Sequence, residues 1–230
     1  MSKGNTFENE LLLHIFNNAA ITLIGDAAGL LPSAGAGSLY IALHTAEPGE
    51  AGDQTTSEIA YTGYARVGVA RSGAGWTVAT NTVTNAAAVT FGQRTDIGTA
   101  VATHWSVGVA AAGASKILYS GPLGTVVQGP FTALAVDNTI RIPGHSLAVD
   151  ERVAFYPAFG SALPGSVVEG TLYWVKTVVG DVITISTTQG GLEFDITSDG
   201  DGVAYEARTL SITQFITPSF AAGDIDITED

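Results

Sequence analysis

Short apolar segments with a two-residue period follow one another along most of the chain, and this pattern constrains the fold more than any other feature. The segment LYIALH at residues 39–44 is the clearest of them, and Gly, Asn or Pro separates the segments at short intervals. Such alternation predicts β-strands, and this spacing of turns is typical of β-sandwiches and jelly rolls. In the first half of the chain, strands are expected at residues 39–44, 64–69, 76–78, 83–91, 103–110 and 116–119.

The N-terminal region has helical spacing instead. Its apolar residues recur every three or four positions from Phe7 to Phe16, which predicts one buried helical stripe over residues 7–17. Thr6 is placed to cap this helix, and Glu8 lies near the positive end of the helix dipole. We therefore expect a mostly β protein with one main helix.

A second run of strand-like segments begins after the sequence GPL at residues 121–123. It includes a hairpin signal at Gly180-Asp181, and the chain has no heptad, collagen-like or other internal repeat that would encode a long shaft. Further strands are expected at residues 139–142, 151–156, 170–179, 181–186, 191–196, 209–216 and 220–227.

The charge of the chain bears on its partners. Nine Lys and Arg against 22 Asp and Glu give a net charge of −13, with no basic run, so binding to nucleic acid is not expected. Charged residues make up only 13% of the chain, against about 25% in ordinary soluble proteins, which favours a protein packed against copies or partners. No segment reaches the ~18 apolar residues of a membrane span. The acidic end at residues 224–230 is interpreted as a solvated tail or a last strand.

Few residue patterns suggest a catalytic or metal-binding site, and the chain has no cysteine. The sequence GHSLA at residues 144–148 falls short of a nucleophile elbow, because the last glycine is Ala148 and a strand is expected to follow, so Ser146 is interpreted as a turn serine. His145 is too close in sequence to be its base. The four histidines share no metal-ligand spacing, and packing or hydrogen bonding is the favoured role of His104. They are His14, His44, His104 and His145.

Two further groups of residues, one acidic and one aromatic, have both a structural and a functional interpretation. The best cation candidate is an acidic, glycine-rich loop at Asp199 and Asp201, with Glu193 and Asp195 upstream, but it lacks EF-hand spacing and a plain turn is favoured. Aromatic residues on the expected strands could form a sugar-binding platform if exposed, although core or interface positions are favoured. These aromatic residues are Trp105, Phe155, Tyr173 and Trp174. No catalytic, cofactor-binding or metal-binding residue is therefore assigned, and no cofactor is expected.

Four segments together resemble a family of small tailed-phage virion proteins that are often labelled tail fibre proteins. They are SLYIALHTAEPGE at residues 38–50, YTGYAR at 61–66, ILYSGPL at 117–123 and PSFAAGD at 218–224. The resemblance implies a jelly-roll-like β-sandwich with an N-terminal helix.

The middle of the chain departs from the simple family pattern. Its sequences IPGHSL at residues 142–147 and EGTLYWV at 169–175 resemble small β modules of phage appendage proteins. The resemblance therefore implies a core formed by residues 1–123 and 209–230, with a β module of residues 124–208 inserted in one loop.

The function expected from these features is that of a non-enzymatic structural virion protein, assembled in the host cytoplasm. A capsid decoration, or cement, protein is preferred: a homotrimer that bridges subunits of the major capsid protein or other virion proteins, with residues 1–7 as a docking arm. A tail fibre or tail-tip protein, whose inserted module engages a host receptor, is the alternative.

Overall fold

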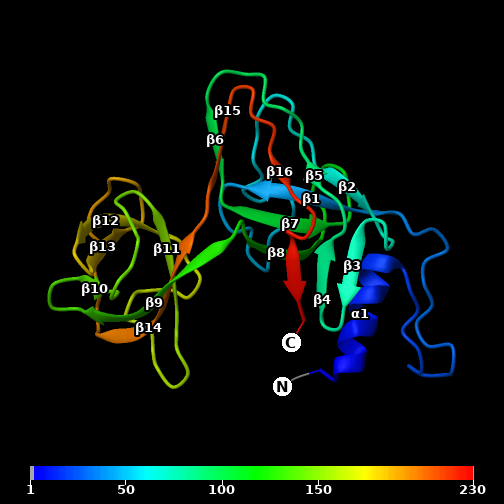
Figure 1. Cartoon of the computed structure of the whole chain (residues 1–230), viewed down its shortest axis with the longest axis horizontal. Coiled ribbons are helices and arrows are strands. Elements are labelled where there is room, and N and C mark those ends of the chain that lie inside the picture. The colour runs from blue at the N-terminus through cyan, green and yellow to red at the C-terminus, as the bar shows by residue number, and fades with distance from the viewer. Residues whose placement is uncertain (1–2, 230) are drawn as a thin grey trace. The chain divides into compact units, whose positions relative to one another are not determined.

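The structure is a computed structural model that describes residues 3–229, except for the side chain of Thr125. These residues form one helix and seventeen strands, so the prediction of a mostly β protein with one main helix is confirmed (Figure 1). The bounds are α1 Asn5–Asn17, β1 Ser38–His44, β2 Val67–Ala70, β3 Trp76–Ala79, β4 Thr82–Asn85, β5 Val89–Thr90, β6 Thr99–Ala102, β7 His104–Gly108, β8 Ile117–Pro122, β9 Thr125–Leu134, β10 Thr139–Arg141, β11 Arg152–Tyr156, β12 Tyr173–Val179, β13 Val182–Ser186, β14 Gly200–Ala207, β15 Leu210–Thr213, β16 Ser219–Phe220 and β17 Asp226–Thr228.

The chain divides into two compact units. Unit 1 comprises Met1–Gly121 and Leu210–Asp230, and unit 2 comprises Pro122–Thr209. Among the described residues, the strands β9 to β14 of unit 2 pair only with one another. Every strand pair of unit 1 is therefore formed without unit 2.

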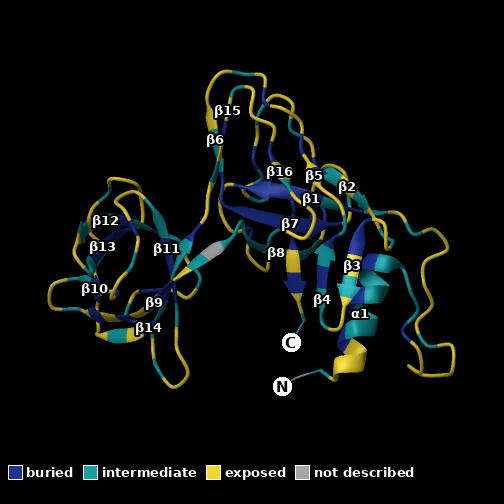
Figure 2. Cartoon of the chain, in the orientation of Figure 1, coloured by how far each residue is buried: buried dark blue, intermediate teal, exposed yellow. Residues whose placement is uncertain are grey.

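Unit 1 is organised around an antiparallel four-stranded sheet in the order β2-β1-β7-β8. All five residues of β7 are buried, and so are the last four residues of β1, because both faces of these central strands are covered (Figure 2). Alternating Leu39, Ile41 and Leu43 are buried on β1. This apolar density explains why residues 39–44 give the strongest strand signal in the sequence.

The C-terminal segment closes unit 1 by pairing with strands far away in the sequence. Strand β15 pairs with β6, β16 with β5, and β17 with β4, all antiparallel. Ile225 and Ile227 are buried, so the acidic end is a last strand up to Thr228. The jelly-roll topology stays a prediction.

Three predicted boundaries in unit 1 are wrong. Helix α1 begins at Asn5 after Gly4, and Thr6 makes no capping bond. Lys3 and Gly4 are therefore the described residues of the expected arm that precede the helix, and Lys3 pairs with Glu229 at 2.9 Å. Residues 1–2 of the expected arm lie outside the described residues. The strand expected at residues 64–69 begins only at β2. The strand expected at residues 83–91 splits at Asn85, whose side chain hydrogen-bonds the backbone of three other residues, Ala87, Ala221 and Ile225.

Helix α1 covers β3 and β4 through one apolar stripe. Leu12 and Phe16 are fully buried, and the ring of Phe16 packs edge-on against Trp76 at 4.7 Å between centroids. The helix ends at Asn18, which adopts the left-handed conformation that ends many helices.

Unit 2 is a closed six-stranded barrel in the order β10-β13-β12-β11-β14-β9. The predicted hairpin at Gly180-Asp181 is confirmed, because Val179 pairs with Val182 across it. The strand expected at residues 191–196 is absent from this described segment. The barrel interior is filled by one apolar cluster, with Phe131, Phe155 and Tyr173 at its centre.

We expect unit 1 to fold without unit 2. Joining Leu123 to Thr209 through a short Gly/Ser linker removes residues 124–208 but keeps every strand pair of unit 1. The shortened protein should be soluble and should melt in one cooperative transition, as single domains do. Calorimetry tests this, and a product that aggregates under all conditions would contradict it.

Candidate functional site

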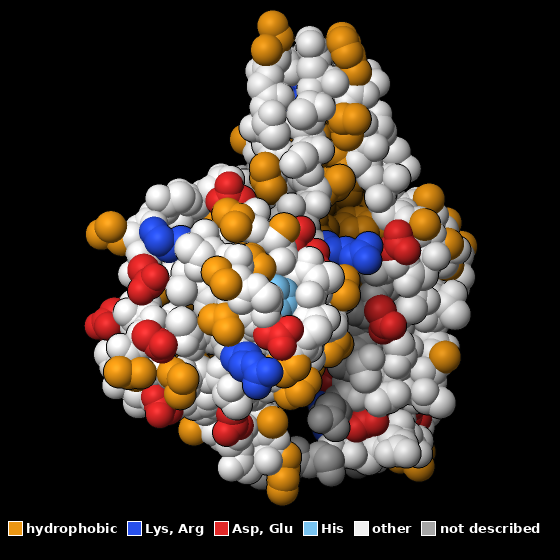
Figure 3. All heavy atoms as spheres, turned by 60° about the vertical axis from the view of Figure 1, so that its left-hand side comes forward, with side chains coloured by type: hydrophobic (Ala, Val, Ile, Leu, Met, Phe, Trp, Pro, Cys, Tyr) orange, Lys and Arg blue, Asp and Glu red, His pale blue; other side chains and the backbone are white. Residues whose placement is uncertain are grey.

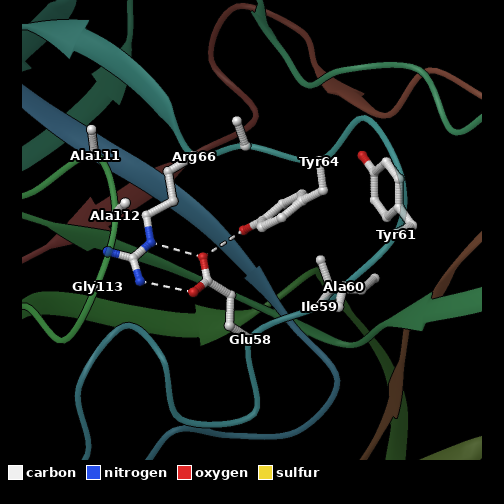
Figure 4. A pocket seen from close by; sticks show the side chains of 10 residues that line it. Glu58, Ile59, Ala60, Tyr61, Tyr64, Arg66, Ala111, Ala112 and Gly113 are labelled. Atoms are coloured by element: carbon white, nitrogen blue, oxygen red, sulfur yellow. Dashed lines mark hydrogen bonds and ion pairs between the residues drawn. The ribbon is translucent and has the colours of Figure 1, made fainter.

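A cavity of unit 1 lies beside the loop that joins β1 to β2. It has a volume of about 450 Å³, which is within the usual range of ligand pockets, about 300–1,000 Å³ (Figure 4). Most of its lining is apolar or aromatic, with two charged residues. The lining residues are Glu58, Ile59, Ala60, Tyr61, Tyr64, Ala65, Arg66, Ala111, Ala112 and Gly113.

The two charged residues of the pocket form a bidentate ion pair. Arg66 donates from Nε to Glu58 Oε1 at 2.7 Å and from Nη2 to Glu58 Oε2 at 2.8 Å (Figure 4). The Tyr64 hydroxyl donates to Glu58 Oε1 at 3.1 Å and accepts the N–H of Leu43 at 3.0 Å. Hydrogen bonds to Glu58 raise the pKa of Arg66, and burial raises that of Tyr64. The pocket wall is therefore rigid and carries no unbalanced charge.

Behind the ion pair, a buried polar network fixes Arg66 on its other side. Its Nη1 donates to Gln54 Oε1 at 3.3 Å, to Ser115 Oγ at 3.2 Å and to the carbonyl of Ala110 at 3.2 Å. Gln54 Nε2 donates in turn to the carbonyl of Tyr40 at 2.8 Å. One guanidinium thus ties the β1–β2 loop to the segment between β7 and β8.

The same network contains a serine–histidine pair. His44 Nδ1 lies 2.9 Å from the carbonyl of Thr56, so it donates there, and neutral Nε2 is left to accept the Ser106 hydroxyl at 2.7 Å. A hydroxyl that donates a hydrogen bond to a neutral imidazole is the arrangement found in activated nucleophiles. Both side chains are 0% exposed, so no substrate reaches them. The pair can stabilise the sheet but cannot act on a bound molecule in this conformation.

The burial of His44 predicts a pH-dependent stability of unit 1. Burial lowers the pKa of His44 below its ordinary value of 6.5, so below that pH the unfolded chain binds a proton more readily than the folded chain. The stabilising contribution of neutral His44 to the free energy of unfolding is fully present above pH 6.5. It is lost as the pH falls toward the folded-state pKa, and the free energy of unfolding then drops by at most about 1.4 kcal/mol per pH unit.

Urea unfolding of the native protein and of His44→Gln between about pH 7 and pH 5 measures this effect, because glutamine does not titrate. The difference in unfolding free energy between the two proteins should shrink as the pH falls. A difference that is constant over this range would contradict the assignment.

The structure does not assemble a catalytic site around Ser146. Its backbone N–H and its hydroxyl both bond Gln128 Oε1, at 2.8 and 3.2 Å. His145 Nδ1 accepts the N–H of Leu147 at 3.0 Å, so neither bond joins His145 to Ser146. The other two histidine side chains bond locally: His14 Nδ1 lies 2.6 Å from the carbonyl of Ala19, and His104 Nδ1 lies 2.9 Å from Thr103 Oγ1.

The acidic segment of unit 2 differs from the expected loop, because it enters strand β14. Asp201 pairs with Thr132 on β9, and the Asp199 carboxylate accepts the N–H of Ala135 at 2.8 Å. Glu193 accepts a bond from Asn138 at 3.4 Å. Among residues 3–229, no three His, Cys, Asp or Glu side chains, Asp195 included, are grouped so that they could hold a metal ion.

The candidate aromatic platform is not assembled. Phe155 and Tyr173 lie inside the barrel, and Trp105 is buried in unit 1. Trp174 is half-buried on β12, and the guanidinium of Arg152 lies 4.2 Å from the centroid of its ring. Core positions therefore account for three of the four residues.

The pocket was not predicted from the sequence. Arg66 falls within the strand expected at residues 64–69 and in the segment YTGYAR, and Glu58 lies outside every expected strand. The one available signal is the scarcity of basic residues, since only nine Lys and Arg occur in the chain and one of them, Arg66, adjoins an apolar strand. Its ion-pair partner lies eight positions away in irregular structure, where no periodicity points to it.

The described residues thus define a mostly β protein with a preformed, largely apolar pocket. No helix of the described part of the chain has the length and apolar content required to cross a membrane. The chain matches, over residues 2–147, the family described as Podophage GP4 fiber I protein gp80. It belongs to this family of phage fibre proteins, which are structural proteins of the virion, and the resemblance noted in the sequence is confirmed. No curated protein matches the chain.

Proposed function

We propose that the protein is a structural subunit of a phage tail fibre. The family match carries this proposal, because the family is described as a fibre protein of a podophage. The matched residues 2–147 include the two central strands of unit 1 and the whole lining of the pocket. The pocket belongs, on this proposal, to the part of the chain that builds the fibre.

The two units have different roles in this proposal. Unit 1 attaches the subunit to the virion and to its neighbours, and the barrel of unit 2 engages a molecule on the host surface. The barrel suits such a role because its strands pair only among themselves within the described chain, so its exposed loops can vary without disturbing unit 1.

Binding without catalysis is part of the proposal. The two hydroxyl–imidazole pairs among the described residues, Ser106 with His44 and Thr103 with His104, are both buried. Ser146 has no histidine partner among its described bonds. Figure 3 shows acidic side chains spread singly over the visible face with few basic ones, which argues against a nucleic-acid partner.

Capsid decoration is the second candidate. It is favoured by the compact units and by the lack of any shaft-forming repeat in the sequence. In that role, a homotrimer would bridge subunits of the major capsid protein and stabilise the lattice by mass action and multivalency.

Labelling of intact particles separates the two candidates. A peptide tag placed after Gly160, in the exposed turn beside Phe159, should leave the barrel intact. Gold-labelled antibody should then decorate the tail, with untagged particles as the control. Label spread over the whole head would overturn the proposal in favour of capsid decoration.

A further inference from the structure

Arg152, the first residue of strand β11, is a cation without a counter-ion in the described part of the chain. It belongs to none of the ion pairs found there, and its Nε is buried without a hydrogen-bond partner among these residues. Buried charges are normally paired, and buried N–H groups normally donate to an acceptor. Arg152 is an exception to both rules, and such an exception in a native fold needs a physical reason.

Trp174 orients the guanidinium. The two residues pair across strands β11 and β12, and Arg152 Cζ lies 4.2 Å from the centroid of the Trp174 ring. A cation over an indole face is attracted by the charge distribution of the ring. This contact holds the guanidinium in place but supplies no acceptor oxygen for its N–H groups.

A comparison with Arg66 shows what Arg152 lacks. Hydrogen bonds to Glu58 raise the pKa of Arg66, whereas burial alone lowers the pKa of Arg152. The desolvation of charged Arg152 is therefore not offset by a neighbouring carboxylate of the described chain. Uncompensated charges lower the stability of a fold, and they cluster at functional sites.

The face of the barrel that carries Arg152 also carries two tyrosines. Val153 belongs to the interior cluster, and successive residues of a strand point to opposite faces, so Arg152 and Tyr156 lie on the outside. Tyr205 pairs with Ala154, which lies between them on β11, and it shares this outer face. The two tyrosine rings are 5.3 Å apart between centroids, at an angle of 85°, and both residues are partly exposed. The face thus offers aromatic rings, hydroxyl groups and a cation.

We infer that Arg152 binds the carboxylate of an acidic sugar, a uronic acid residue in an otherwise uncharged glycan. A planar guanidinium matches a carboxylate through two parallel N–H···O bonds. Because Nε is enclosed, the edge that a ligand meets is formed by Nη1 and Nη2. The tyrosines of the same face have rings whose negative faces attract the C–H groups of a sugar ring.

The charges of the chain favour a ligand with a single carboxylate. Phosphate groups carry up to about two negative charges and are generally bound by clusters of arginines. Lys176, two residues beyond Trp174, does not extend the site into such a cluster, because its Nζ donates to the carbonyl of Gly191 at 2.6 Å. The net charge of −13 repels a ligand with many negative charges. An isolated carboxylate on a neutral glycan is therefore the anion that fits one guanidinium.

The inference rests on the proposed function, in which the barrel of unit 2 engages a molecule on the host surface, and it names the class of that molecule. The two can fail separately, because labelling locates the protein on particles and sugar binding is measured on purified protein. A labelled tail without sugar binding would contradict only the inference. A labelled head with sugar binding would contradict only the proposed function.

Two matched sugars test the carboxylate with the full chain. Methyl glucuronide and methyl glucoside differ only in this group, which is a hydroxymethyl group in the glucoside. The glucuronide should shift the NMR signals of the Arg152 Nε–H and of the Trp174 indole N–H. The glucoside should bind about tenfold more weakly or less. Equal binding of the two sugars, or no binding of the glucuronide, would overturn the inference.

Acetate and inorganic phosphate separate the sugar from the bare anion. Both should bind more weakly than the glucuronide, because neither has a ring to pack against the tyrosines. Acetate binding as tightly would show that the site accepts any carboxylate, including that of an acidic peptide. Phosphate binding more tightly would show a preference for another anion. Either result would overturn the assignment of an acidic sugar.

Arg152→Gln removes the charge and should abolish binding of the glucuronide. Its melting temperature should equal or exceed that of the native protein, because no ion pair with a described residue is lost. Arg141→Gln, which changes an exposed arginine of the same unit, is the matched control and should bind like the native protein. Binding retained by Arg152→Gln, or lost equally in both variants, would show that Arg152 does not hold the ligand.

Discussion

Replacement of Arg66 by leucine is expected to lower the free energy of unfolding of unit 1 by about 3–5 kcal/mol, the usual cost of breaking a buried ion pair. The Arg66 side chain is 2% exposed and bonds four side chains or carbonyls at once. Its loss leaves buried Gln54 and Ser115, and partly exposed Glu58, without their common partner. Urea unfolding, with hydrogen exchange resolved to peptides of each unit, measures the change.

Arg141→Leu is the matched control for this experiment. Arg141 and Asp181 form an ion pair of 3.5 Å at the surface of unit 2, with 63% and 42% of the two side chains exposed. Exposed pairs contribute about 0–1 kcal/mol, so this substitution should change little. Equal effects of the two arginine substitutions would show that the network around Arg66 does not support the fold.

Phe155→Ala is expected to destabilise unit 2 by about 3–5 kcal/mol, as usual for a phenylalanine removed from a core. Phe155 is fully buried at the centre of the barrel and packs edge-on against Phe131, with 4.9 Å between ring centroids. Because the barrel strands pair only with one another among the described residues, unit 1 should retain its stability. The same peptide-resolved unfolding experiment reports on both units.

Phe159→Ala removes the same side chain from the surface of the same unit. Phe159 is fully exposed in the loop after β11, and its loss should change the stability by less than about 0.5 kcal/mol. A loss of unit 1 stability with Phe155→Ala would contradict the independence of the two units.

The sequence predicted the elements whose signal is local. Strand β1 is a dense apolar run bounded by Pro48 and Gly49, and the hairpin at Gly180-Asp181 has a turn glycine with a φ of 59°. Boundaries failed where contacts with distant segments of the chain decided them. Asn85 ends β4 because its bonds to Ala221 and Ile225 are tertiary, and no property of residues 83–91 reveals them.

The pocket could not be predicted for a related reason. Its lining comes from two loops about 50 residues apart in the sequence, brought together because β1 pairs with β7. The long-range contacts of Arg66 with Ala110 and Ser115 depend on that pairing. Loop residues have no periodicity, so the sequence shows only the residue types and not that they meet.

The copy number of the protein in purified virions tests the proposed tail-fibre role most directly. Quantitative mass spectrometry of intact particles, with the major capsid protein as internal reference, gives this number. We expect a few to some tens of copies per particle, because a tail has few attachment sites. Hundreds of copies, in proportion to the capsid lattice, would contradict it and would identify the protein as a component of the head.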